Sequence, residues 1–187
     1  LKKGSHQVST NNQIYKGWLE LTPVTQDDLP SIAEHYAHEV RAGVATFDTS
    51  IPDLSYWHRK FLESESQTYP IWVARDLHSG GAVVGWAGVS RFDPKLAYER
   101  CAEFSFYVLG SYQGKGVGRV LFSHALTNLK KHATIQTLVS RIALQQEASL
   151  HLHRSMGFKH IGTLEDVGFK LGNALSVALY QYHLNSV

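Results

Sequence analysis

A run of three alternating glycines constrains this chain more than any other feature of its sequence. Gly114, Gly116 and Gly118 stand where an alternating apolar segment, residues 101–109, gives way to a segment of helical periodicity, residues 116–132. Glycine lets the backbone turn sharply and approach a ligand closely. The first N–H groups of a helix have no partner within it, and they lie at the positive end of its dipole. The pattern therefore predicts a strand, a tight turn and a helix whose N-terminus binds phosphate.

Lys115 and Arg119 add positive charge beside this turn, although a glycine-rich turn that merely begins a helix is an alternative interpretation. Two nucleotide-binding motifs are excluded. A P-loop ends in Gly-Lys followed by Ser or Thr, whereas Gly118 is followed here by Arg119 and Val120. A Rossmann fingerprint needs an acidic residue about 20 residues downstream, where this chain is apolar or neutral.

The composition indicates one globular domain without a nucleic-acid-binding surface. The chain has 187 residues, of which 43% are apolar and 18% charged, which is enough to bury a core and atypical of disorder. Its net charge of +2, from 18 basic and 16 acidic residues, is too even to predict nucleic-acid binding. Cys101 is the only cysteine, so an internal disulfide and a cysteine-rich metal site are excluded, and we expect no metal.

The two ends of the chain differ in character. Residues 1–15 are polar and lack the apolar stretch of a signal peptide, so we expect a disordered leader or a remnant of expression there, followed by a single domain over residues 16–187. No apolar run is long enough to span a membrane, and the lone cysteine fits a reducing compartment. We therefore expect a cytoplasmic protein that does not bind membranes.

Strand and helix patterns alternate along the rest of the chain, which predicts a mixed α and β fold with an antiparallel start and crossover helices later. Four apolar residues of the second expected helix are assigned to one face: Leu54, Trp57, Phe61 and Leu62. The expected strands are residues 18–24, 71–76, 82–89, 101–109, 137–142, 158–164 and 176–184, and the expected helices are residues 27–40, 53–65, 116–132 and 147–156.

Two motifs give the chain a specific resemblance. The segment Gln113-Gly114-Lys115-Gly116-Val117-Gly118 matches the Gln/Arg-x-x-Gly-x-Gly/Ala signature of the GNAT superfamily of acetyltransferases. Downstream, His153 precedes Gly157-Phe158 by four residues, which is similar to that superfamily's helix-end pattern. The chain also resembles the phosphinothricin N-acetyltransferase-like branch over roughly residues 18–184. The residues that carry this second likeness are Ala45-Thr46-Phe47, Ala97-Tyr98, Glu103-Phe104-Ser105-Phe106-Tyr107-Val108, His153 and Gly168-Phe169-Lys170-x-Gly172.

The resemblance implies a GNAT fold, which is a twisted mixed sheet of about seven strands with about four helices, splayed between its fourth and fifth strands. It also implies that acetyl-CoA binds in the splay, that the primary amine of a small amino-acid analogue is acetylated, and that the protein is a homodimer. The analogue would be of the phosphinothricin or methionine sulfone/sulfoximine type. The residues expected to contact acetyl-CoA are Phe106, Tyr107, Val108, Gln113, Gly114, Lys115, Gly116, Val117, Gly118, Arg119, Gln146 and Ser149.

The resemblance also assigns the chemistry. Glu103 matches a family glutamate on the strand that leads into the phosphate turn, and it is the candidate general base for the substrate ammonium. His153, where the superfamily often has a tyrosine, is the candidate that protonates the departing thiolate or relays a proton. A carboxylate in a surface salt bridge and a histidine packed at a helix end are the structural alternatives for these two residues.

The expected acceptor pocket contains Phe47, Phe92 and Tyr98 as walls, with Lys95 and Lys170 as positive charges. Lys95 stands where the family commonly has an arginine, and a lysine cannot form the planar bidentate fork of an arginine. Asp93 replaces a frequently basic residue, and Gln146 replaces a usual asparagine.

Three other functions remain open at this stage. The acceptor could be a polyamine or an aminoglycoside, which an open acidic groove would favour, or a protein N-terminus. The protein could also be a non-catalytic acetyl-CoA-binding regulator, although both Glu103 and His153 are present. A nucleotide-binding module is disfavoured by the missing Ser or Thr and the missing metal carboxylates.

Overall fold

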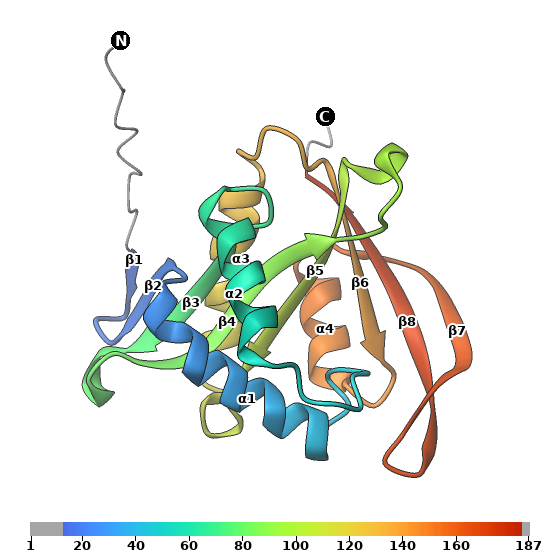
Figure 1. Cartoon of the computed structure of the whole chain (residues 1–187), viewed down its shortest axis with the longest axis horizontal. Coiled ribbons are helices and arrows are strands. Elements are labelled where there is room, and N and C mark those ends of the chain that lie inside the picture. Colours follow the sequence, from blue (N-terminus) through green and yellow to red (C-terminus); the bar gives the residue numbers. More distant parts are fainter. Residues whose placement is uncertain (1–12, 185–187) are drawn as a thin grey trace.

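The computed structural model describes residues 13–184, which form one mixed sheet with helices on both faces (Figure 1). The eight strands follow the order β1-β2-β3-β4-β5-β6-β8-β7, and only the β5–β6 pair is parallel. The strands are β1 (Gln13–Tyr15), β2 (Leu19–Pro23), β3 (Ile71–Asp76), β4 (Ala82–Arg91), β5 (Cys101–Val108), β6 (Thr137–Ala143), β7 (Lys159–Lys170) and β8 (Asn173–His183).

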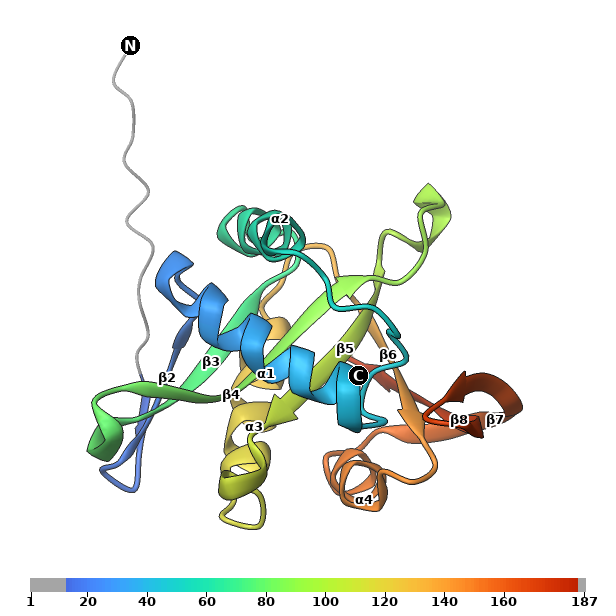
Figure 2. The ribbon, with the colours of Figure 1, turned by 60° about the horizontal axis from the view of Figure 1, so that its bottom comes forward.

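Two pairs of helices bury opposite faces of this sheet, as the second view shows (Figure 2). Helices α1 (Leu29–Ala42) and α2 (Leu54–Glu65) cover one face, where Ile32, Tyr36 and Trp57 pack on β3 and β4. Helices α3 (Val117–Leu129) and α4 (Glu147–Ser155) lie on the other face, and α3 buries an apolar stripe in the larger core cluster. The periodic apolar residues of α1 and α3 thus fix the layers above and below the sheet.

The start of α1 is tied to the sheet by a buried ion pair. Asp28 is 3% exposed, and it accepts hydrogen bonds from the backbone and side chain of Thr25 while its carboxylate pairs with Arg75 of β3 at 2.6 Å. A carboxylate at the first turn also complements the helix dipole. The N-terminal end of α1 is thereby fixed against β3.

The sheet opens between its two parallel strands. β5 and β6 pair only from Cys101 with Thr137 to Glu103 with Val139, although both strands continue beyond this point. Ser140 bridges the last contact by donating a hydrogen bond of 2.9 Å to the carbonyl of Phe104. Beyond Phe104, β5 has a partner strand on its β4 side only.

This architecture confirms the expected fold class, including the splay between the fourth and fifth of the expected strands. The expected strand over residues 71–76 coincides with β3, and Asp53 caps α2 through the backbone N–H of Tyr56 as the pattern predicts. Residues 13–15 correct the expectation of a leader, because they form β1 and pair with β2; residues 1–12 lie outside the described residues. β1 brings the number of strands to eight.

Two other details differ from the expectation. Leu54 and Leu62 of α2 are 50% and 59% exposed, so the buried face of this helix is narrower than its apolar residues suggest. β7 and β8 are longer than predicted and join at Leu171 and Gly172, whose φ angles of +53° and +79° make a tight two-residue hairpin turn. A bulge in β7 hides the strand pattern, since the register shifts between Leu164 and Gly168.

Candidate active site

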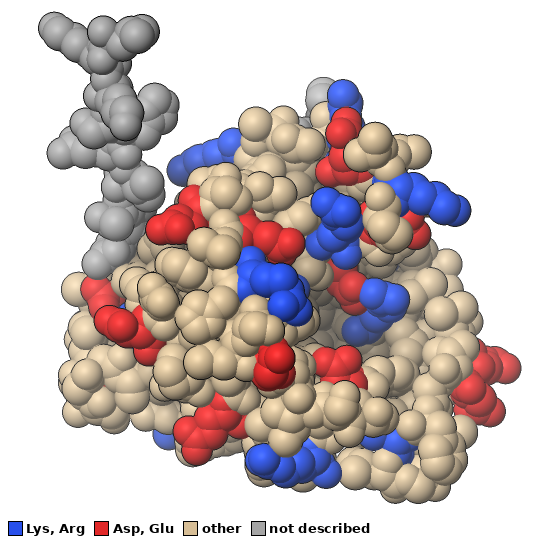
Figure 3. All heavy atoms as spheres, in the orientation of Figure 1, with Lys and Arg blue, Asp and Glu red and all other residues tan. Residues whose placement is uncertain are grey.

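A cavity of about 1290 Å³ enters the molecule at the splay between β5 and β6. Its walls come from α1, α2 and the loop over residues 43–50 on one side of β5, and from α3 and α4 on the other. The space-filling view shows a hollow in this face, with charged side chains of both signs around it (Figure 3). Both candidate catalytic residues, Glu103 and His153, line this cavity.

The glycine turn forms one end of the cavity. Gly114 and Gly116 have φ angles of +73° and +88°, and Gly116 is the N-cap residue directly before α3. These left-handed angles favour glycine and aim the first N–H groups of α3 outward. At Gly118 a Cβ atom would lie 3.4 Å from Leu152 and 3.6 Å from Phe106, which is ordinary van der Waals contact, so the packing of α3 does not itself require a glycine at this third position. The turn therefore has the geometry of a phosphate-binding helix N-terminus.

Side chains hold this turn in place from several directions. Gln113 donates to the carbonyl of Val108 at 3.1 Å, which ties the turn to the end of β5. Tyr112 donates to Asp76 at 2.7 Å, which links the turn to the end of β3. Arg119, which lines the cavity, donates to Ser155 at 3.0 Å and so joins α3 to α4. A turn fixed before ligand binding loses little conformational entropy when it binds.

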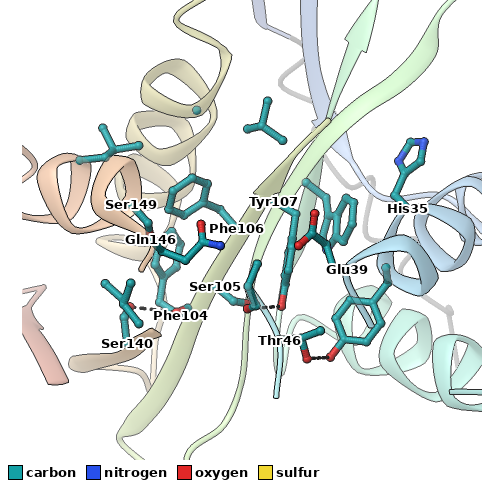
Figure 4. Close-up of a pocket in the computed structure, with 18 of the residues that line it drawn as sticks. His35, Glu39, Thr46, Phe104, Ser105, Phe106, Tyr107, Ser140, Gln146 and Ser149 are labelled. Carbon is teal, nitrogen blue, oxygen red and sulfur yellow. Dashed lines mark hydrogen bonds between the residues drawn. The ribbon is translucent and has the colours of Figure 1, made fainter. Parts of the chain in front are cut away.

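Neighbouring residues of β5 point to opposite sides, which divides the cavity into two halves. In Figure 4 Phe106 lies on the same side of the strand as Gln146 and Ser149, whereas Tyr107 lies with His35 and Glu39. We call the first side, with the glycine turn, the donor half, and the second side, with α1 and α2, the acceptor half. Tyr107 stacks on Trp86 at a centroid distance of 4.7 Å and forms the floor of the acceptor half.

His153 is buried in an aromatic cage within the donor half. It is 2% exposed, and its Nδ1 donates to the carbonyl of Ser149 at 2.8 Å while its Nε2 has no hydrogen-bond partner. Burial lowers the pKa of His153 to about 4. The ring is thus neutral at neutral pH, with a lone pair on Nε2 and its single proton on Nδ1, where it is bonded to the carbonyl of Ser149. The rings around it are Phe104, Phe106, Phe122, Phe158 and Tyr180.

Glu103 lies at the point where β5 leaves β6. Both of its carboxylate oxygens are paired with Arg141 of β6, one of them with Nε at 2.8 Å. This two-point contact fixes the carboxylate at the mouth of the splay, on the side of β5 that Tyr107 and the acceptor half share. A carboxylate in this place can accept a proton directly or through one water molecule.

The loop over residues 43–50 closes the acceptor half and is anchored to the rest of the fold. The hydroxyl of Tyr36 lies 2.6 Å from that of Thr46 and donates to Asp48 at 2.8 Å. Lys170 is buried, and its Nζ donates to the carbonyls of Thr46 at 2.7 Å and of Glu39 at 2.9 Å. Phe47 packs so closely on Gly168 that a Cβ atom there would overlap its ring.

The structure brings together most but not all of the residues expected from the sequence. Lys115 lies over the ring of Tyr112, and Val117 is fully buried in the core, so the side chains of these two residues do not line the cavity. The expected cofactor residues that line it are Phe106, Tyr107, Val108, Gln113, Gly114, Gly116, Gly118, Arg119, Gln146 and Ser149.

Among the expected acceptor residues, Phe47 alone lines the cavity. Phe92 and Tyr98 lie on the loop between β4 and β5, where their ring centroids are 5.5 Å apart. Neither residue lines the cavity. Lys95 is exposed on the same loop, and Lys170 serves as the buried anchor described above. Residues that the sequence did not single out line the acceptor half in their place: His35, Tyr36, Glu39, Asp48, Tyr56, Lys60 and Trp86. A signal was present in the four-residue spacings of His35 with Glu39 and of Tyr56 with Lys60, which place each pair on one helix face.

Two classes of feature are absent from the part of the chain that the structure describes. No helix among residues 13–184 is long and apolar enough to cross a membrane. No group of three or more His, Cys, Asp or Glu side chains in this range is arranged to hold a metal ion.

Comparison with known proteins agrees with this geometry. Residues 29–158 match the acetyltransferase (GNAT) family. Phosphinothricin N-acetyltransferase of Alcaligenes faecalis is 34% identical, with 87% of this chain and 81% of that protein covered. The L-methionine sulfoximine/L-methionine sulfone acetyltransferase of Pseudomonas aeruginosa is 32% identical over 84% of this chain and 90% of its own length.

A solved structure shows the same arrangement. The phosphinothricin acetyltransferase of Sinorhizobium meliloti in complex with acetyl-CoA superimposes with a TM-score of 0.81 and 32% identity, covering 87% of this chain and 86% of that one. The match of the family over most of the chain, the splayed sheet and the glycine turn at the start of α3 lead to one conclusion: this chain belongs to the GNAT family of acetyltransferases.

Proposed function

We propose that this acetyltransferase transfers the acetyl group of acetyl-CoA to the primary amine of a small amino-acid analogue. The observation that carries the proposal is one continuous cavity that joins the N-terminus of α3 to Glu103 and then to the acceptor half. The relatives named above act on phosphinothricin and on methionine sulfoximine or sulfone, which are small amino-acid analogues.

Acetyl-CoA supplies a thioester carbonyl whose C–S bond is exchanged for the C–N bond of the product amide. The N-terminus of α3 and Arg119 are placed to hold its pyrophosphate. The backbone of β5 beyond Phe104, which lacks a partner strand on the β6 side, offers hydrogen bonds to its polar arm. The cavity thus orients donor and acceptor, and orientation alone lowers a bimolecular barrier substantially.

Glu103 takes the proton that the substrate ammonium must lose before its nitrogen attacks the carbonyl carbon. Arg141 holds the carboxylate in position for this step. His153 is neutral and keeps its one ring proton on the carbonyl of Ser149, so we assign it to shaping the donor half rather than to proton donation. The departing thiolate is stable enough to leave without an acid at moderate pH.

We further propose that the protein is a cytoplasmic homodimer. Support for the dimer comes from β7, the outermost strand of the sheet, which carries Ile161, Val167 and Phe169 at 52%, 55% and 72% exposure. An apolar edge strand of this kind favours pairing with another chain. A free Cys101 is consistent with a reducing compartment.

A thiol-release assay with acetyl-CoA and a panel of amines tests the reaction. We expect turnover of amino-acid analogues and little turnover of polyamines or aminoglycosides. Efficient acetylation of polyamines with no acetylation of any amino acid would contradict the acceptor class. Failure to bind acetyl-CoA would contradict the reaction itself.

The cofactor position has its own test in Gly116→Glu. The new side chain blocks the approach of the pyrophosphate and its charge repels it, so calorimetry should show acetyl-CoA binding weakened by at least about 100-fold. Gly17→Glu is a matched control, because Gly17 has a φ angle of +75°, has open space around it and lies in the β1–β2 turn. Equal affinity for acetyl-CoA in the two folded variants would mean that the pyrophosphate lies elsewhere.

A further inference from the structure

Lys60 of α2 brings a positive charge into the wall of the acceptor half. Its side chain is half-buried, and its Nζ lies 5.4 Å from the centre of the Tyr56 ring. Among residues 13–184, no carboxylate oxygen lies within 4.0 Å of this ammonium group. Within the same range, its ammonium group lies over the face of the Tyr56 ring and forms no ion pair, which leaves its N–H donors available to a ligand.

Two of the three acids that act on the charge of Lys60 are engaged elsewhere, and the third, Glu63, is exposed on the same helix and does not approach the ammonium within 4.0 Å. Glu103 is held on both oxygens by Arg141, and Asp48 accepts the hydroxyl of Tyr36. Burial lowers the pKa of Lys60, and the charges of Glu63, Glu103 and Asp48 only partly oppose this effect. An anionic group that entered the cavity would supply the counter-ion that the protein withholds, and the exchange would be favourable because the site is already partly desolvated.

The charges of the acceptor half are arranged in opposite signs along the cavity wall. Lys60 lies on α2, whereas the acidic side chains of Glu39, Asp48 and Glu103 come from α1, the loop over residues 43–50 and β5. A zwitterion is complementary to such a wall, since its ammonium meets the acids and its carboxylate meets the lysine. A polyamine would bring only positive charges, one of which would face Lys60.

We propose that Lys60 binds the α-carboxylate of the acceptor amino acid while the acceptor's amine lies toward Glu103. This inference rests on the proposed function and names the group that recognises its substrate class. It replaces Lys95, the cation that the resemblance favours, because Lys95 is exposed on the β4–β5 loop and does not line the cavity.

The test compares each amino-acid acceptor with its own carboxamide, which keeps the amine and side chain but lacks the negative charge. Lys60→Met removes the charge and keeps most of the length of the side chain. We expect kcat/KM for the acid to fall about 10- to 100-fold, chiefly through KM, because a charge contact mostly supplies uniform binding. The carboxamide should lose less than about twofold. The ratio of kcat/KM in the variant to kcat/KM in wild type is taken for the acid and for the carboxamide separately. Dividing the first ratio by the second cancels the different basicities of the two amines.

Three further variants sharpen the comparison. Lys60→Arg keeps the charge and should retain most of the preference for the acid. Arg59→Met is the matched control, since Arg59 is the neighbouring cation of α2, is exposed, does not line the cavity and donates to Ser55. It should leave the preference unchanged. Lys95→Met decides between the two candidate cations, and calorimetry with acetyl-CoA confirms that each variant keeps its donor half.

Each possible result has a definite meaning. Equal losses for acid and carboxamide in Lys60→Met would give Lys60 a structural role and overturn the inference, with the proposed function intact. Loss of the preference for the acid over its carboxamide in Lys95→Met, with the preference retained in Lys60→Met, would also overturn the inference. A wild-type protein that acetylates none of the acceptors would defeat the proposed function and the inference together.

Discussion

Glu103 is the residue on which the chemistry of the cavity depends. Glu103→Gln keeps the shape of the side chain and its place beside Arg141 but removes the basic oxygen. We expect kcat to fall about 100- to 10,000-fold with acetyl-CoA affinity nearly unchanged, since this is the usual range for general-base catalysis. At high pH more of the amine is already free, so the gap from wild type should narrow.

A pH–rate profile with a good acceptor measures both effects, and Glu99→Gln, at an exposed glutamate on the neighbouring loop, is the control. Equal rates for wild type and Glu103→Gln across about pH 6–9, with chemistry rate-limiting, would leave Glu103 as a structural partner of Arg141.

Among the elements of the fold, the loop over residues 43–50 couples the acceptor half to β7. Lys170 donates to the carbonyl of Thr46 in this loop and to that of Glu39 in the last turn of α1, so it ties the loop and the helix to β7. Lys170→Met removes the donor to the Thr46 carbonyl, whereas the Glu39 carbonyl keeps the N–H of Gly43, and the change should cost about 1–3 kcal/mol of stability. Because the loop then moves more freely, we expect KM for the acceptor to rise about tenfold with acetyl-CoA affinity unchanged.

Steady-state kinetics with the acceptor and acetyl-CoA varied separately measures whether the KM for the acceptor rises while that for acetyl-CoA stays the same. Lys159→Met, at an exposed lysine of the same strand, controls for the loss of a charge on β7. If Lys170→Met folds normally and leaves the acceptor KM unchanged, the loop does not shape the acceptor half.

For the whole molecule, the buried His153 makes stability depend on pH. The pKa of this ring is about 4 in the folded protein, below the ordinary value of 6.5, so the unfolded chain binds its proton more readily. The contribution of His153 to the free energy of unfolding is therefore complete above pH 6.5 and is lost as pH falls towards 4. Its total size is about 3 kcal/mol. His35 and His124, whose pKa values burial also lowers, act in the same direction.

Urea denaturation at a series of pH values measures this slope. His153→Phe, which fills the aromatic cage without a titrating group, should flatten the slope, whereas His151→Phe, at an exposed position two residues away, should not. The same slope in wild type and His153→Phe would mean that the buried ring does not control acid sensitivity.

The parts of the fold that were predictable are those in which local sequence dictates local geometry. The turn at Gly114 and Gly116 was predictable because left-handed φ angles favour glycine, so the glycines in the sequence indicate where the chain turns. β3 was bounded correctly because Pro70 and the turn at Gly80 enclose an apolar run. β7 was underestimated because Asp166, with a φ angle of +51°, lies in a bulge that interrupts the alternation of side chains.

The acceptor half was less predictable, because its residues converge only through tertiary packing. His35, Tyr56 and Lys60 come from two helices, and their approach to β5 depends on how those helices cross the sheet. No local pattern encodes that crossing. Conversely, the resemblance directed attention to Lys95 and Tyr98, but in the structure both are exposed on the β4–β5 loop and neither lines the cavity.

The splay affects how firmly the two parts of the sheet are joined. β5 and β6 share backbone pairing over only three residues, so the part of the sheet before this seam and the part after it are joined more weakly than either is within itself. A ligand that bridges the seam acts as a cross-link between two leaves, and it stiffens the molecule along the line where it is softest.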